Sequence, residues 1–182
     1  MPAAILRPAS LVSDRAMTQN VISPGLNIAT PIYTDGKVFI SSNYGTGAAL
    51  IRLTDREEPQ TVWKSLAMQN HISTSVLYQG NLYGFSEDRL RCLDFQTGKA
   101  RWDKSGLGKG SLTVADGQLI VLGQHGELVL VKPNPNEYTE VSRCQVFDKG
   151  TLTWTVPVVS DGRLFIRSEN VLLALSLRRE TS

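Results

Sequence analysis

The sequence is poor in the residues that hold metal ions or cross-link a chain. It has two cysteines and two histidines among its 182 residues. Cys92 and Cys144 stand 52 positions apart, form no CxxC motif and have no histidine at metal-ligand spacing. We therefore predict no metal site and expect both cysteines to be buried or half-buried thiols in strands. A disulfide between them is an alternative without support in the sequence.

An excess of charge and long apolar runs are also missing. The net charge is +2 from 19 basic and 17 acidic residues, and no basic tract or interleaving of basic and aromatic residues occurs, which argues against nucleic-acid binding. No apolar run approaches the length of a transmembrane helix. The first fifteen residues, MPAAILRPASLVSDR, hold only a short apolar patch and do not form a secretory signal. The sequence by itself therefore assigns no localisation.

What the sequence does contain is a repeated hairpin signal. Four Asp-Gly or Gln-Gly pairs precede the strand-like runs KVFIS, NLYGF, QLIVL and RLFIR, and their glycines are Gly36, Gly80, Gly117 and Gly162. The successive spacings are 44, 37 and 45 residues. A β-branched residue stands four positions before each glycine and an apolar one two positions after it. A period of this length is typical of radial arrays and not of a single sandwich.

Each repeat has the size of a propeller blade. In residues 73–102, strand-like runs at 74–77, 81–85, 90–95 and 100–102 are separated by turn residues. Four short antiparallel strands in about forty residues are typical of a blade. We predict an all-β fold, a partial β-propeller of four-stranded antiparallel blades with about four blades visible.

The repeats also set the expected domain boundaries. The blades cover about 27–64, 65–103, 104–148 and 149–182, and the last has no room for an outer strand. Residues 1–26 are either an N-terminal arm or the remnant of a preceding blade. Aromatic residues close the fourth run of three repeats, and we expect these residues to lie on outer strands and to pack one blade on the next: Trp63, Trp102 and Phe147.

Candidate site residues follow from propeller geometry. Loops between second and third strands, and segments that enter the innermost strands, gather on the face where blades connect. This predicts the following channel-face candidates: Asn43, Tyr44, Asn70, His71, Lys109, His125 and Trp154. Trp154 either lines the channel or stacks on a ligand, or it has an ordinary packing role. His71 either faces the channel or makes a structural hydrogen bond. His125 is expected to be exposed. The run GLGKGS at 106–111 is not a P-loop, because a glycine separates its lysine from its serine and a strand follows.

Three segments carry a resemblance to a known family. LDFQTGKARW at 93–102, VVSDGRLFI at 158–166 and VLLAL at 171–175 resemble the pyrroloquinoline-quinone (PQQ)-like repeat of quinoprotein alcohol dehydrogenases and of the outer-membrane assembly factor BamB. The wider resemblance, to the C-terminal half of such propellers, covers roughly residues 27–177. It implies a noncatalytic binding or scaffold module of the bacterial cell envelope or periplasm. The alternative that it implies is the C-terminal half of a quinone-dependent alcohol dehydrogenase.

The chain departs from this family in its number of blades and in its cofactor residues. Half a propeller leaves sheet faces bare, so we expect either a fragment of a longer propeller or two copies that close an eight-bladed ring; the partners are then other proteins or a second copy. Family dehydrogenases hold PQQ with Ca²⁺ through oxygen ligands, and many have adjacent cysteines, which this chain lacks. Its acids include turn-forming Asp35, Asp116 and Asp161. We predict no catalytic residue and no bound cofactor. PQQ and Ca²⁺ are expected only if the chain is half of a quinone-dependent alcohol dehydrogenase.

Overall fold

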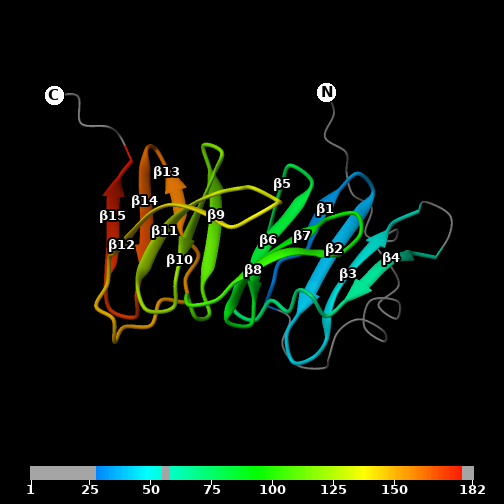
Figure 1. Cartoon of the computed structure of the whole chain (residues 1–182), viewed down its shortest axis with the longest axis horizontal. Coiled ribbons are helices and arrows are strands. Elements are labelled where there is room, and N and C mark those ends of the chain that lie inside the picture. Colours follow the sequence, from blue (N-terminus) through cyan, green and yellow to red (C-terminus); the bar gives the residue numbers. More distant parts are fainter. Residues whose placement is uncertain (1–27, 55–57, 178–182) are drawn as a thin grey trace, which may run out of the picture.

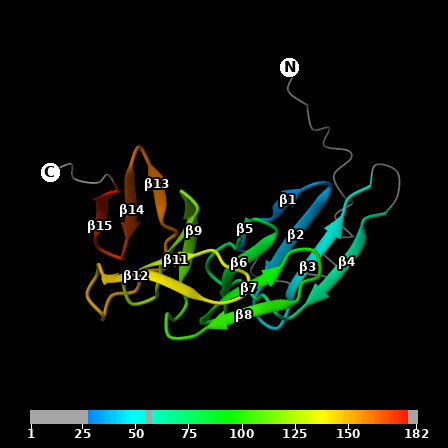
Figure 2. The same ribbon diagram turned by 45° about the horizontal axis from the view of Figure 1, so that its top comes forward.

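The computed structural model describes residues 28–54 and 58–177. In these ranges the regular structure consists of fifteen strands in four sheets, which stand side by side along the molecule (Figures 1 and 2). No helix of the described residues is long and apolar enough to cross a membrane. The expected segment 1–26 lies outside the described residues.

We number the sheets in chain order. Sheet 1 contains β1 (Ile32–Thr34), β2 (Lys37–Ser42), β3 (Gly47–Arg52) and β4 (Gln60–Ser65). Sheet 2 contains β5 (Val76–Tyr78), β6 (Asn81–Ser86), β7 (Arg89–Asp94) and β8 (Ala100–Lys104). Sheet 3 contains β9 (Ser111–Ala115), β10 (Gln118–Leu122), β11 (Glu127–Lys132) and β12 (Thr139–Gln145). Sheet 4 contains β13 (Val158–Ser160), β14 (Arg163–Arg167) and β15 (Leu172–Ser176).

Every sheet is an antiparallel meander in which strands that are consecutive in the chain are neighbours in space. The first strands of sheets 2 and 3 lie next to each other, since β5 contacts β9. Sheets 1 to 3 each have four strands, and sheet 4 has three among the described residues. The predicted all-β partial propeller of four-stranded antiparallel blades is therefore confirmed.

The hairpin between the first two strands has the same turn in all four sheets. Both central residues have positive φ, for example 49° and 70° at Asp35 and Gly36, and 47° and 76° at Gln79 and Gly80. This is the type I′ geometry, whose twist matches that of the flanking strands. Asp and Gly tolerate it well, whereas Gln adopts positive φ less readily. The repeated sequence signal is thus a repeated turn.

Each sheet has two faces, defined here by the direction of the chain. The forward face points to the next sheet, and the backward face points to the previous one. The registers align the same forward positions in each sheet: Ile32, Phe39, Ala48 and Leu50 in sheet 1; Val76, Tyr83, Leu90 and Cys92 in sheet 2; Thr113, Ile120, Leu128 and Leu130 in sheet 3; Val158, Phe165, Leu172 and Ala174 in sheet 4.

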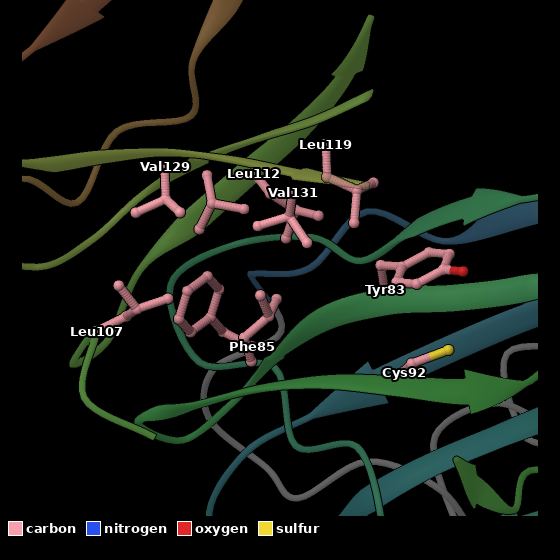
Figure 3. Packing of buried hydrophobic residues seen from close by; sticks show 10 residues of the cluster. Tyr83, Phe85, Cys92, Leu107, Leu112, Leu119, Val129 and Val131 are labelled. Carbon is pink, nitrogen blue, oxygen red and sulfur yellow. The ribbon is translucent and has the colours of Figure 1, made fainter. Parts of the chain in front are cut away.

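Apolar clusters between neighbouring sheets hold the array together. Figure 3 shows the cluster between sheets 2 and 3, where Tyr83 and Phe85 face Leu119, Val129 and Val131. All five side chains are at least 98% buried. Burial of an aliphatic side chain of this size contributes about 1.5–3 kcal/mol, so these clusters are the main force between sheets.

Tryptophans on outer strands connect each of the first two sheets to the next one. Trp63 on β4 pairs with Leu50, and its Nε1–H donates to the Phe95 carbonyl of sheet 2 at 2.9 Å. Trp102 on β8 pairs with Cys92, and its Nε1–H donates to the Asn134 carbonyl of sheet 3 at 2.7 Å. Both rings also pack against the adjoining clusters, so each tryptophan combines apolar burial with an intersheet hydrogen bond.

The structure corrects the placement of Phe147. The position equivalent to Trp102 in sheet 3 is the exposed Ser142, which pairs with Leu130. Phe147 lies beyond the end of β12 and is buried with Leu164 of sheet 4. It stands five residues after Ser142, as Leu107 stands five after Trp102. Phe147 therefore belongs to the linker that leads to the next sheet, and not to an outer strand.

The cysteines also differ from expectation. Cys92 is buried in the cluster between sheets 2 and 3, as predicted, but Cys144 is exposed. The reason is its strand, because β12 is the outermost strand of sheet 3 and is exposed along nearly its whole length. Both thiols are free, so the alternative of a disulfide between them is excluded in this structure.

Candidate functional site

Turns and linkers from neighbouring repeats meet on one side of the array, here called the loop face. The Gly45 N–H in the β2–β3 turn donates to Gln69 Oε1 at 3.0 Å. The Glu87 N–H in the β6–β7 turn donates to the carbonyl of the same Gln69 at 3.2 Å. One sheet further, the Gln124 N–H donates to the Leu107 carbonyl at 2.8 Å. The linker that enters each inner strand is thus bound to neighbouring turns, as propeller geometry requires.

Asn70 fixes the middle of this face. It is 2% exposed, and its backbone N–H donates to Ser41 Oγ at 3.0 Å. Its side chain donates to the Phe85 carbonyl at 2.9 Å and accepts from Ser75 Oγ at 3.0 Å. Because every one of these groups is buried and paired, Asn70 has a structural role and holds the next residue in place.

That next residue, His71, joins three repeats. Its Nε2 lies 2.9 Å from Tyr44 Oη of the β2–β3 turn, and the two rings meet edge to face at a centroid distance of 5.3 Å. Its Nδ1 lies 3.1 Å from Lys109 Nζ, in the linker that enters sheet 3. An ammonium can only donate, so Nδ1 accepts from Lys109 and Nε2–H donates to Tyr44. We call these three residues the loop-face cluster.

The backbone around the cluster is held in a specific form. Tyr44 has a φ of 58°, which is uncommon for a bulky side chain and occurs where surrounding contacts impose it. The Lys109 N–H donates to Gln124 Oε1 at 2.7 Å. Gln69 and Gln124 therefore position the cluster, and sequence reasoning missed both, because a glutamine in a linker or turn has no distinctive pattern.

The other predicted site residues do not join the cluster. Asn43 is 4% exposed, and its side-chain oxygen is buried without a hydrogen-bond partner. His125 is exposed, and its backbone carbonyl accepts from Gln145 at 2.6 Å. Trp154 is 48% exposed and stands eight residues before its hairpin glycine, as Lys109 does one repeat earlier. Trp154 thus lies one sheet further along, and both its channel-lining and its packing role stay predictions.

The loop-face cluster does not fit a calcium ion. Ca²⁺ needs several oxygen ligands around one point, whereas this cluster offers an ammonium, an imidazole and one hydroxyl. Within residues 28–54 and 58–177, no three side chains of His, Cys, Asp or Glu gather as a metal ion would require.

A second candidate surface is the forward face of sheet 4. Leu172 is 67% exposed and Val158 is 54% exposed. The positions equivalent to Leu172 are Ala48 and Leu90, which are at most 1% exposed because the next sheet covers them. The same repeat position is thus core in sheets 1 and 2 and surface in sheet 4. Among the described residues no further strand pairs with β15, which leaves it as an edge strand.

The backward face of sheet 1 is the opposite end of the array (Figures 1 and 2). The strand registers place Tyr33, Val38 and Ile51 in one row across this face. The equivalent row of sheet 2 consists of Leu77, Leu82 and Leu93. Ile51 is buried in a small cluster with Ile40 and Ala49, while Tyr33 is 68% exposed. This face is therefore apolar in composition and matches the type of surface that sheet 2 presents to sheet 1.

Comparison with known proteins shows the fold and no closer relationship. Neither a protein-family model nor a curated protein matches the chain. BamB from Moraxella catarrhalis is similar over 80% of this chain and 41% of its own chain, with 17% identity and a TM-score of 0.61. The N-terminal domain of Nup159 is similar over 78% and 39%, with 15% identity and a TM-score of 0.55. A europium-containing methanol dehydrogenase is similar over 63% and 24%, with 14% identity and a TM-score of 0.48.

The chain spans less than half the length of each of these structures. At such identities the similarity to BamB and Nup159 establishes a β-propeller architecture and nothing more specific.

Proposed function

We propose that this chain is a noncatalytic β-propeller module of the PQQ-like, BamB-like kind, which acts as a binding or scaffold protein of the bacterial cell envelope. Its repeat segments and the similarity to BamB support this assignment, including the localisation. The observation that carries the binding role is the exposed forward face of sheet 4, where residues equivalent to blade core meet solvent. An apolar sheet face of this kind marks a protein interface.

The partner that best fits this face is a second copy of the chain. Every other forward face of the array is covered by a backward face, and the backward face of sheet 1 has the matching apolar register at Tyr33, Val38 and Ile51. Two copies related in this way place eight blades in one ring, which is within the known range of propellers. A closed ring also covers the exposed forward face of sheet 4 and the exposed Tyr33 of sheet 1.

Replacement of an exposed residue on the forward face tests this proposal. Leu172→Asp removes no core contact, because the side chain is largely exposed, so the chain is expected to stay folded. In the dimer it places an unpaired carboxylate against an apolar face, and we expect the dissociation constant to rise at least about tenfold. Sedimentation velocity of both proteins at about 10 µM measures this change.

Val141→Asp is the matched control. Val141 is 54% exposed on β12, away from the forward face of sheet 4, so its replacement should leave self-association unchanged. Equal weakening by both substitutions would mean that added charge, and not this face, controls association. A wild-type chain that sediments as a monomer would contradict the second copy as partner.

A further inference from the structure

The loop-face cluster has the features of a small anion-binding site. Its centre is preorganised, because the buried Asn70 is hydrogen-bonded through both its backbone and its side chain and the adjacent His71 is held between Tyr44 and Lys109. Ser73 extends this fixed segment, since its hydroxyl donates to the Gly110 carbonyl of the next linker at 2.9 Å. A ligand that binds here meets donors that are already in position, which lowers the entropic cost of binding.

Two donors of the cluster have unused hydrogens. The Lys109 ammonium has three N–H groups, and its only side-chain partner among the described residues is His71 Nδ1. Tyr44 Oη accepts from His71 Nε2–H, so its own proton is free to donate. A cation and a hydroxyl therefore lie on the two sides of one imidazole, on the face where one turn and two linkers from three repeats meet.

Lys109 also lacks a counter-ion within the described ranges. Three arginines there are paired with acids: Arg89 with Asp103, Arg101 with Asp94, and Arg143 with Glu140. Lys109 is half-buried, so its charge is less screened than that of a fully exposed lysine. An anion on this face gains a charge-assisted hydrogen bond from Lys109 without first having to displace a protein carboxylate.

The single cation of the cluster favours a monoanion over a dianion. The cluster holds a single cation, and the β6–β7 turn beside Gln69 carries Glu87 and Asp88. A phosphate dianion is repelled by these acids and is usually held by several donors, such as an arginine fork or a nest of backbone N–H groups. A carboxylate needs one cation and one or two neutral donors. We propose that Lys109 and Tyr44, oriented by His71, bind a carboxylate group of a ligand on the loop face.

An acetate titration of the ¹⁵N-labelled full chain tests the site. Backbone amide resonances are followed by NMR at constant ionic strength, with sodium chloride exchanged for sodium acetate. We expect saturable shifts centred on Tyr44, His71 and Lys109. Lys109→Met should weaken acetate binding at least about tenfold, and Tyr44→Phe about fivefold, since each removes a donor but keeps most of the side chain.

The control variant is Lys149→Met. Lys149 is exposed in the linker that enters sheet 4, and its replacement removes the same charge without touching the cluster. Acetate affinity should then match the wild type. Lys109→Arg keeps the cation and should retain binding, which separates loss of charge from loss of fold.

A second titration identifies the source of the carboxylate. The probe is a short peptide with blocked ends and one aspartate, compared with acetate on the same resonances. Tighter binding of the peptide indicates a carboxylate of a protein partner, and equal affinity indicates a small-molecule acid. Shifts that do not saturate, or that persist in Lys109→Met, would overturn the proposal. The outcome is independent of self-association, because the cluster and the forward face of sheet 4 are separate surfaces.

Discussion

Trp102→Ala should be among the most damaging single substitutions in this chain. The indole packs against Tyr83 and Tyr138, at centroid distances of 6.0 and 5.7 Å, and its N–H donates to the Asn134 carbonyl at 2.7 Å. Truncation of a core tryptophan to alanine costs about 3–5 kcal/mol; Trp102 is partly buried, so we expect about 3 kcal/mol, to which the lost intersheet hydrogen bond adds about 1 kcal/mol. Since domain stabilities are about 5–15 kcal/mol, the variant should lose about a quarter or more of its free energy of unfolding.

Ser142→Ala is the matched control for this prediction. Ser142 occupies the equivalent outer-strand position one sheet later but is exposed, so its replacement should change the free energy of unfolding by less than about 0.5 kcal/mol. Urea unfolding followed by tryptophan fluorescence and by far-ultraviolet circular dichroism measures both variants.

Phe147→Ala completes the series. Phe147 is 7% exposed and packs with Leu164 of sheet 4, so its truncation should also cost about 3–5 kcal/mol. A neutral Trp102→Ala, or a Ser142→Ala as damaging as Trp102→Ala, would refute the register that places these residues in the repeat.

Three further predictions concern single groups. Gln79→Asn should stabilise the chain by up to about 1 kcal/mol in the same unfolding assay, because asparagine accepts the positive φ of 47° more readily than glutamine. Burial raises the pKa of Cys92 to about 11, so a thiol reagent at neutral pH should modify Cys144 alone in the native chain and both thiols after unfolding; two rapidly reacting native thiols would contradict the burial. Hydrogen bonds from Arg143 lower the pKa of Glu140 from 4.5 to about 2, so this pair stabilises the fold above pH 4.5, and the stabilisation is lost as the pH falls from there towards 2. Glu140→Gln should flatten that part of the stability-pH profile, and an unchanged profile would show that the pair contributes nothing.

The architecture could be predicted from sequence because its signals are local. A type I′ turn restricts which residues can stand at its two centres, so the Asp-Gly and Gln-Gly pairs appear directly in the chain and their spacing reveals the repeat. Alternation of apolar residues around each turn then gives the strands. These features need no information about contacts between distant residues.

The residue that occupies the forward-facing position of each outer strand could not be predicted in the same way. Because Trp63 and Trp102 lie on outer strands, the sequence suggested that the next aromatic at a similar spacing, Phe147, does so too. The residue of sheet 3 at the position of Trp102 is instead Ser142. The regular spacing lies instead in the apolar residue of each linker: Met68, Leu107 and Phe147 stand 39 and 40 residues apart. The side chains at these three positions are chemically different, and what they share is burial between neighbouring sheets.

The candidate site was predictable as a face but not as a set of contacts. Propeller geometry places Tyr44, His71 and Lys109 on the loop face, because all three belong to turns or linkers at the same end of the strands. Which of these side chains meet depends on their reach across neighbouring repeats and on the hydrogen bonds of Gln69 and Gln124. Sequence patterns do not contain that information.

Cross-linking between first strands would show whether sheet 4 of one copy docks on sheet 1 of a second copy. Within the chain β5 contacts β9, so in a closed ring β13 of one copy should lie equally close to β1 of its partner. The measurement uses Tyr33→Cys/Val158→Cys in a Cys144→Ser background, treated with a short bis-maleimide. We expect a covalent dimer of twice the 20.0 kDa chain mass from the double variant, and none from Val158→Cys alone. No dimer from the double variant, or equal cross-linking of the single one, would contradict it.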